Sequence, residues 1–136
     1  MTIRLVLLAI ALLLASALAA AITASAARSA RHIGTWGGVV ASVLGMTASL
    51  LAILGDDVST LRATWSLPVG ELHVGLDALS AFFLLCVFTV SALALVYGAG
   101  YLRSFAEGPR LAHASALFNV LVAAMAGLVL ARDGIL

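Results

Sequence analysis

Two residues of this sequence stand out as able to do chemistry, an acid and an amide beside or inside long apolar segments. Asp77 directly precedes one such segment, and Asn119 lies within another. An acid there could form the mouth of a proton or ion path, or it could be a helix N-terminal residue favoured by the helix dipole, with Ser80 three residues on. An amide inside a membrane helix could order a water wire, or it could hydrogen-bond neighbouring helices together. Asp77 and Asn119 are therefore proton-path candidates, and both alternatives stay open.

No other pattern predicts a catalytic residue, a cofactor site or a metal site. Cys86 is the single cysteine, which excludes an internal disulfide and a structural zinc site. His73 and His113 fall in expected loops, and neither has a second ligand at metal-binding spacing. The basic residues are seven arginines that form no cluster, so a nucleic-acid partner is not indicated.

The composition predicts a membrane protein. Hydrophobic residues make up 64% of the chain and charged residues 10%, and the mean hydropathy is +1.21. A soluble domain normally carries about 25% charged residues on its hydrated exterior. The expected solvent of this chain is therefore mostly the lipid bilayer.

Four apolar segments without acids, bases or imidazoles are expected to be the elements that position these residues. They cover residues 5–27, 33–54, 78–102 and 114–131. The shortest would measure roughly 27 Å as a helix, close to the ~30 Å hydrocarbon thickness of a bilayer. Backbone groups in lipid must be satisfied internally, so the segments should be helices. The sequence predicts an all-α membrane protein, a single domain over residues 1–136 built as a bundle of about four transmembrane helices.

The first segment also resembles a cleavable signal peptide, with Arg4 before it and a small-residue stretch at 24–26. The apolar run is long for a signal core, and Arg28 and Arg31 follow it directly. Positive charge there resists translocation, so a retained helix is predicted.

Small residues at four-residue spacing are expected to form the packing ridges of the helices: 15, 19, 23 and 27; 37, 41, 45 and 49; and, after Asn119, 123, 127 and 131.

The arginine distribution predicts the orientation. The expected short loops, 28–32 and 103–113, carry four arginines, and the opposite side carries three. Positively charged loops tend to remain in the cytoplasm. We therefore expect both short loops inside, both ends of the chain outside, and a multi-pass protein of the cell inner (plasma) membrane.

The long outer loop, 55–77, is expected to contain a short hairpin. Apolar residues fall at 65, 67 and 69 and again at 72, 74 and 76, on both sides of Gly70 and Glu71. Pro68 makes the first arm an edge strand. An isolated hairpin is marginal in water, so this extracytoplasmic hairpin should rest on the second and third helices, with Leu72 and Val74 buried.

The second half of the chain resembles a known family. Residues 67–70 read Leu-Pro-Val-Gly, a predicted strand follows, and residues 76–83 read Leu-Asp-Ala-Leu-Ser-Ala-Phe-Phe. Residues 96–97 and 100–103 resemble the end of the family's helix, and 118–119, 125 and 130–133 resemble its next helix. The pattern is similar to that of the antiporter-like, proton-conducting subunits of respiratory complex I and membrane-bound hydrogenases, most of all to hydrogenase-4 component B and its formate hydrogenlyase relative.

The resemblance implies part of a proton-translocating membrane subunit of a hydrogenase- or NADH dehydrogenase-like complex. Other membrane subunits would be its partners, and redox chemistry would belong to subunits with metal centres, so no catalytic redox residue is expected here. The family's Trp-Glu pair and its buried Lys and His residues lie in later helices, and no position of this sequence matches them. Because residues 135–136 begin a new apolar run, the chain is expected to be the N-terminal part of a longer subunit.

Two alternatives remain beside this interpretation. A subunit of a multi-subunit cation/proton antiporter would show the same pattern, because the families share ancestry. A small non-enzymatic membrane scaffold, complete as written, would also fit the composition.

Overall fold

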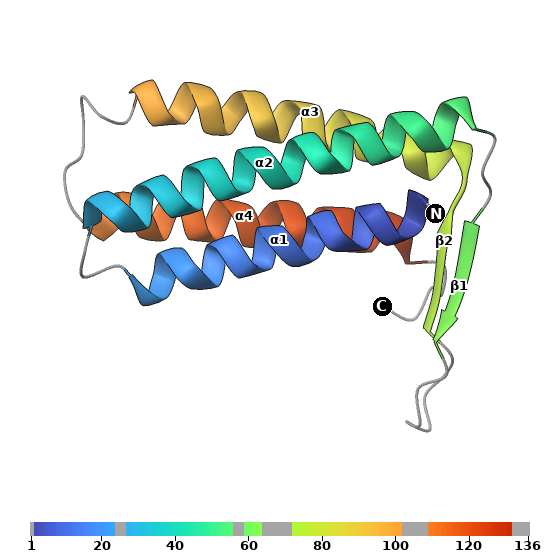
Figure 1. Cartoon of the computed structure of the whole chain (residues 1–136), viewed down its shortest axis with the longest axis horizontal. Helices are drawn as coiled ribbons and strands as arrows, with labels where there is room; N and C mark the ends of the chain where they lie inside the picture. Colours follow the sequence, from blue (N-terminus) through green and yellow to red (C-terminus); the bar gives the residue numbers. More distant parts are fainter. Residues whose placement is uncertain (1, 24–26, 56–58, 64–71, 102–108, 132–136) are drawn as a thin grey trace.

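The computed structural model describes residues 2–23, 27–55, 59–63, 72–101 and 109–131. Four helices and two strands follow in the order α1 (Thr2–Ile22), α2 (Ala27–Leu54), β1 (Ser59–Ala63), β2 (Leu72–Leu76), α3 (Ala78–Tyr101) and α4 (Pro109–Leu130) (Figure 1). The helices run side by side, and the two strands lie across one end of them. We call this end the hairpin end and the opposite end, where α1 passes to α2 and α3 to α4, the loop end.

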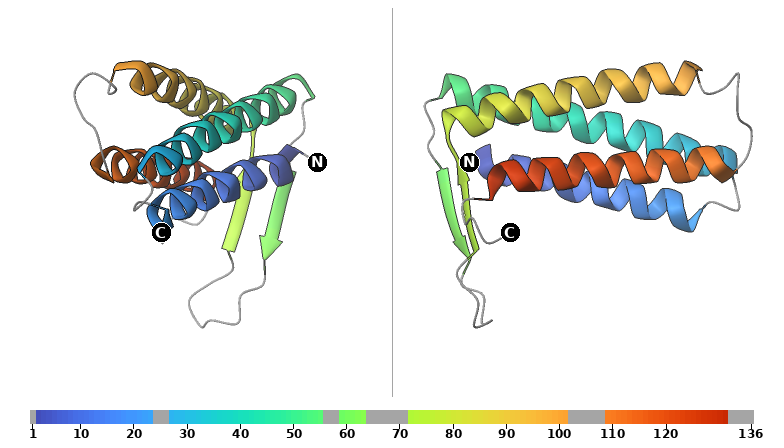
Figure 2. Two further views of the ribbon diagram at one scale, coloured as in Figure 1. Left: turned by 60° about the vertical axis from the view of Figure 1, so that its left-hand side comes forward. Right: turned by 180° about the vertical axis from the view of Figure 1, so that it is seen from behind.

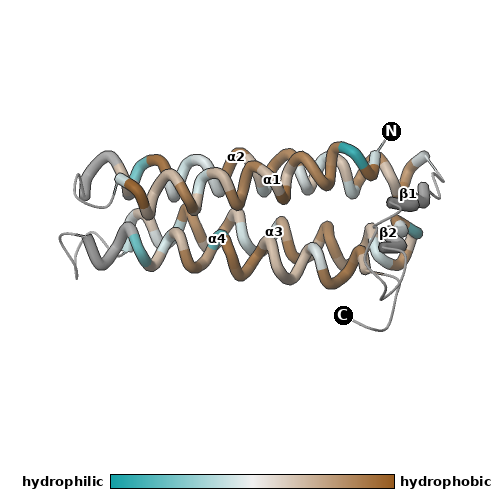
Figure 3. The backbone as a smooth tube through the Cα atoms, turned by 90° about the horizontal axis from the view of Figure 1, so that it is seen from below, coloured by the Kyte–Doolittle hydropathy of each residue, from teal (hydrophilic) through white to brown (hydrophobic). Residues whose placement is uncertain are grey.

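The predicted all-α architecture is confirmed. All four helices are long and apolar enough to span a membrane, over Thr2–Ile22, His32–Leu54, Ala78–Tyr101 and His113–Leu130. Apolar residues line the helices along most of their length (Figure 3). Large apolar side chains such as Leu18, Leu93 and Leu117 are more than half exposed on the outside of the bundle, where lipid replaces water as the solvent. The chain is a multi-pass membrane protein in contact with the lipid bilayer.

The bundle has a short diagonal between α2 and α4. Each of these two helices packs against all three others, and the views from two sides show them between α1 and α3 (Figure 2). The buried face of α2 is made almost entirely of small residues at helical spacing: Gly34, Thr35, Gly38, Ala41, Ser42, Gly45, Ala48, Ser49 and Ala52. Small residues allow helix backbones to approach closely, which explains how α2 can pack against three neighbouring helices.

The helix boundaries differ from the expected ones mainly at the loop end. The first helix ends at Ile22 instead of 27, and α2 already begins at Ala27. The expected loop 28–32 is therefore the start of α2, and α4 begins at Pro109, inside the expected loop 103–113. Charge marks the edge of the hydrocarbon layer and does not end a helix, and proline is well suited to the first position of α4.

The packing ridges were only partly predicted. On α2, Ala41, Gly45 and Ser49 are buried as expected. On α1 the expected Ala15 is exposed, and the buried residues are instead Thr2, Ile3, Val6, Ala9, Leu13, Ser16, Ala17 and Ala20. On α4 the expected Gly127 is exposed. A helix that is apolar all round carries no sequence signal for which side faces its neighbours.

The hairpin exists, with a different first arm. The predicted second arm is β2, and it pairs antiparallel with β1, from Ser59 opposite Leu76 to Ala63 opposite Leu72. The predicted partner, 65–69, was wrong, and these residues lie outside the described part of the chain. Pro68 would remove one hydrogen-bond donor from that arm, whereas 59–63 contains no proline.

The hairpin rests on the first and fourth helices, not on the second and third as predicted. The main helix contacts of β1 are with α1, and those of β2 are with α4. Leu76 is fully buried in the core, while the side chains of Leu72 and Val74 lie outside the described ones. The hairpin thus closes the end of the bundle where α1 begins and α4 ends (Figure 1). The side of the membrane on which it lies stays a prediction.

Candidate functional site

Asn119 forms the most connected buried polar group in the described part of the chain. It lies midway along α4 and is fully buried. Its amide nitrogen Nδ2 donates one hydrogen bond to Ser16 Oγ of α1 at 2.9 Å and another to the backbone carbonyl of Gly34 of α2 at 2.8 Å. One side chain therefore connects three of the four helices.

Glycines on α2 make this geometry possible. A Cβ on Gly34 would lie 2.5 Å from Ser115 Oγ and 3.1 Å from Ala20 Cβ, and a Cβ on Gly37 would lie 2.6 Å from Ser16 Cβ. The distances to Ser115 and Ser16 are shorter than real Cβ contacts, so the glycines let the α2 backbone come this near to α1 and α4 without displacing a neighbour. The close approach places the Gly34 carbonyl within reach of the amide.

The oxygen of the same amide, unlike the nitrogen, accepts no conventional hydrogen bond. Asn119 Oδ1 is buried without a hydrogen-bond partner, and a Cβ on Gly38 would lie 2.5 Å from it. The amide oxygen therefore sits against the α2 backbone at a position where only a hydrogen atom fits, an arrangement typical of weak Cα–H···O contacts between helices. We call Ser16, Gly34, Gly38, Ser115 and Asn119 the Asn119 cluster.

Most other hydroxyl groups inside the bundle bond to their own helix. Ser16 Oγ donates to the Leu13 carbonyl, Ser49 Oγ to the Gly45 carbonyl and Ser91 Oγ to the Val87 carbonyl, all at 2.7–2.8 Å. Such bonds to the preceding turn leave no free donor. Ser42 Oγ, one turn beyond Gly38, is buried without a partner. The cluster can hold helices together and orient a polar group, but an amide and hydroxyls do not titrate near neutral pH.

Asp77 is the N-cap of α3. Its carboxylate oxygen Oδ1 accepts a hydrogen bond from the Ser80 backbone N–H at 2.8 Å, and the helix begins at the next residue, Ala78. This is the geometry by which an acidic N-cap satisfies one of the free N–H groups of the first turn. The expected helix-starting role is thereby confirmed.

The structure does not bring the two proton-path candidates together. Asp77 lies at the hairpin end, while Asn119 lies eleven residues before the end of α4 at that same side, which corresponds to roughly 16 Å along the axis. A proton-path role of either residue stays a prediction.

The remaining candidates are dispersed. His32 and His113 are exposed at the loop end, and Cys86 is exposed on α3. Within the described ranges, no group of three or more His, Cys, Asp or Glu side chains could hold a metal ion. Sequence reasoning identified Asn119 but missed its partners Ser16 and Gly34, because a serine or glycine in an apolar helix gives no sign of which neighbour it faces.

Comparison with protein-family models gave no match, and neither did the comparisons with curated proteins and with solved structures.

Proposed function

We propose that this chain is the helix-packing part of a proton-translocating membrane subunit, in a hydrogenase- or NADH dehydrogenase-like respiratory complex of the inner (plasma) membrane. One observation carries the proposal. A short strand, β2, runs directly into Asp77, which caps α3. The resemblance of residues 65–136 to antiporter-like subunits rests on this same order of a strand, a Leu-Asp pair and a long apolar helix.

The proposed role is to hold helices in place, with the proton-relay groups supplied by other parts of the complex. The stretches 5–22, 33–54, 78–101 and 114–130 contain no Asp, Glu, Lys, Arg or His. Proton relays through membranes normally use such groups. The Asn119 cluster supports a packing role, because it fixes α1, α2 and α4 relative to one another by hydrogen bonds.

Affinity purification under mild conditions tests this proposal. The gene would carry a tag at its chromosomal locus, and the membranes would be solubilised in a gentle detergent. We expect hydrogenase or NADH dehydrogenase-like subunits with metal centres to co-purify, together with other antiporter-like membrane subunits. Recovery of a set of cation/proton antiporter subunits, without any redox subunit, would support the antiporter alternative instead.

A scaffold function is the second candidate, favoured by the same lack of ionisable groups within the spans. Proton flux separates a packing role from an independent channel. The chain alone, reconstituted in liposomes with a pH gradient, should conduct no protons above the background of a scrambled apolar control. A specific flux that depends on the gradient would contradict both the packing role and the scaffold function.

A further inference from the structure

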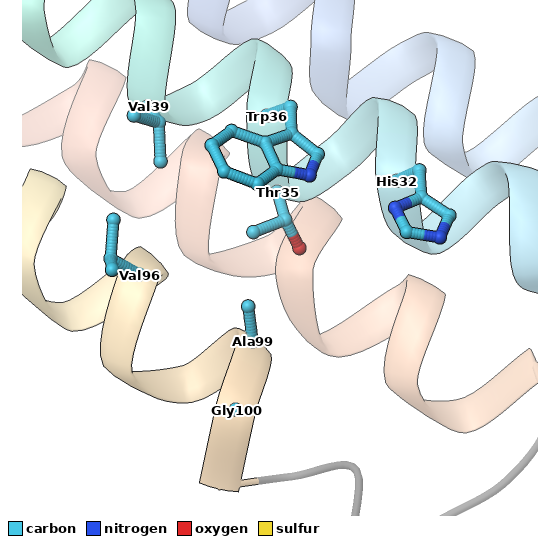
Figure 4. Close-up of a pocket in the computed structure, with 7 residues that line it drawn as sticks. All are labelled: His32, Thr35, Trp36, Val39, Val96, Ala99 and Gly100. Carbon is cyan, nitrogen blue, oxygen red and sulfur yellow. The ribbon is translucent and has the colours of Figure 1, made fainter.

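A groove opens between the start of α2 and the end of α3. It encloses about 230 Å³ and is lined from α2 by His32, Thr35, Trp36 and Val39 and from α3 by Val96, Ala99 and Gly100 (Figure 4). This volume is below the ~300 Å³ at which small-molecule pockets usually begin. The groove can therefore hold a segment of a larger molecule whose remainder lies outside.

The groove is polar at one end and apolar at the other. His32 lies toward the start of α2, and the nitrogen of the Trp36 indole and the hydroxyl of Thr35 lie on the side nearer to it (Figure 4). Val39 and Val96 form the opposite end. Seven residues separate His32 from Val39, or roughly 10 Å along the helix. Over this length the lining changes from side chains with hydrogen-bond donors to purely apolar side chains.

The groove is open to the side on which lipid lies. Trp36 is 57% exposed and Val96 is 54% exposed. A Cβ placed on Gly100, which lines the groove, would meet nothing within 4 Å, so the space beside this glycine is open. A molecule in the surrounding bilayer can therefore enter the groove sideways.

The polar end lies at the level of the lipid headgroups. Tyr101, the last residue of α3, is exposed and stacks on Tyr97 with ring centroids 5.6 Å apart. Tyrosine and tryptophan concentrate where a membrane helix leaves the hydrocarbon layer. The span of α2 also begins at His32, which places the donors of the groove at that boundary.

The sequence of the segments next to the polar end contains more basic than acidic residues. Arg28 and Arg31 occupy the α2 positions one turn before His32 and Thr35. No acidic residue occurs in the groove segments 27–39 and 96–101, and the connection from α3 to α4 with the first turn of α4 carries Arg103 and Arg110 against Glu107. The composition of these segments therefore favours a ligand with a net negative charge.

We propose that the groove binds an anionic glycerophospholipid. The lipid phosphate accepts hydrogen bonds from the Trp36 indole N–H, the Thr35 hydroxyl and an imidazole N–H of His32, all of which are donors at neutral pH. One acyl chain lies along Val39 and Val96, and the rest of the lipid stays in the bilayer. The bound lipid fills the opening between α2 and α3 at the loop end.

Quenching of Trp36 fluorescence tests the proposal directly. The chain has two tryptophans, so Trp65→Phe leaves Trp36 as the single reporter. The variant would be reconstituted in phosphatidylcholine vesicles that contain a small fraction of brominated phosphatidylglycerol or, separately, brominated phosphatidylcholine. We expect half-maximal quenching by the anionic lipid at an about tenfold lower mole fraction, because the phosphate of phosphatidylcholine is balanced by its cationic choline, whereas the anionic lipid keeps a net negative charge. Equal quenching by the two lipids would overturn the proposal.

Two glycine variants in this background provide a matched pair. Gly100→Leu fills the groove and should abolish the preference for the anionic lipid. Gly127→Leu on α4, where an added Cβ likewise meets nothing within 4 Å, should keep it. An unchanged preference in Gly100→Leu, or an equal loss in both variants, would contradict a site in this groove.

His32→Leu keeps the test decisive even if Gly100→Leu fails to insert. His32 is exposed, so its replacement should leave the core intact. We expect this variant to need a several-fold higher mole fraction of either brominated lipid for half-maximal quenching, because the phosphate that His32 would contact is common to both. An unchanged mole fraction for both lipids in His32→Leu would show that the groove does not recognise the headgroup.

Discussion

The two halves of the bundle are packed by different means. Toward the hairpin end the core is built from large apolar side chains, among them Val6, Leu13, Leu76, Leu84, Phe88 and Leu130. Toward the loop end most of the buried apolar residues are alanines, Ala17, Ala20, Ala30 and Ala116, with Leu95 as the larger exception, and the Asn119 cluster lies beside them. Lipid provides no hydrophobic drive between helices, so the helices must be held together by close packing and hydrogen bonds. The hairpin-end half relies mainly on packing of large side chains, and the loop-end half on small residues and hydrogen bonds.

Both halves rely on a glycine of α2, but with different neighbours. A Cβ on Gly45 would lie 2.5–2.6 Å from the ring of Phe88, so in the hairpin-end half an aromatic ring rests on the helix backbone. Gly34 and Gly38 instead admit the hydroxyl of Ser115 and the amide of Asn119. An added side chain at Gly45 therefore meets only an apolar ring, whereas one at Gly38 also meets the amide of Asn119 and disturbs its hydrogen bonds.

The largest expected effect is that of Phe88→Ala. Phe88 is the largest fully buried side chain described, and its loss should lower the free energy of unfolding by about 3 kcal/mol, at the lower end for such truncations because lipid replaces water as the solvent. Reversible unfolding in mixed micelles would measure it.

A double-mutant cycle sharpens this test. Gly45→Ala should destabilise the parent, since the added methyl group meets the ring, but it should be tolerated in the Phe88→Leu background. Additive effects of the two substitutions would mean that the ring does not rest on Gly45.

Gly38→Ala should have the second largest effect, a loss of about 2 kcal/mol. The added Cβ would lie 2.5 Å from Asn119 Oδ1 and 2.7 Å from Leu95 Cδ1, so the amide and its hydrogen bonds must move. Gly127→Ala is the control, because its Cβ would point into open space. Similar thermal stability of the two variants in detergent would argue against close packing at Gly38.

The contrast between the halves also explains what the sequence could predict. The four spans follow from composition, and Asp77 and Asn119 were identified because each is a rare polar residue at the edge or inside of an apolar segment. The cap role of Asp77 needs only local chain geometry, so it was predictable. The partners of Asn119 were not, since Ser16 is one of several serines in the helices and no amphipathic pattern distinguishes them.

The predictions of the helix and strand boundaries were inaccurate for related physical reasons. Charge placement predicts where hydrocarbon ends, but the α2 helix continues through Arg28 and Arg31 into the headgroup region. Alternation of apolar and polar residues identified β2. The sequence of β1, Ser-Thr-Leu-Arg-Ala, shows this alternation only weakly, and β1 pairs with β2 through backbone groups. Long-range pairing of this kind depends on register rather than on residue type.

Removing the amide in the loop-end half should have a moderate effect. Asn119→Leu loses the bonds to Ser16 and Gly34, and we expect a cost of about 1 kcal/mol, within the range for hydrogen bonds between membrane helices. The cost stays small because Ser16 Oγ keeps its bond to the Leu13 carbonyl. If Ser16→Ala in the Asn119→Leu background costs as much as in the parent, the two side chains are not coupled.

The smallest effect is expected for Asp77→Asn at the hairpin end, a substitution that separates the two roles considered for Asp77. Asp77→Ala removes the N-cap of α3 and should cost about 1 kcal/mol, while Asp77→Asn keeps an oxygen that can accept the Ser80 N–H bond and should cost only a few tenths. Asn cannot carry a proton, so the same variant in membranes of the native complex would report on proton transfer. If the residue acts as a cap alone, redox-driven proton pumping by Asp77→Asn should equal that of the parent. Loss of pumping in a variant that melts at the parent temperature would instead assign Asp77 to a proton path and make the hairpin end, rather than the Asn119 cluster, the chemically active half.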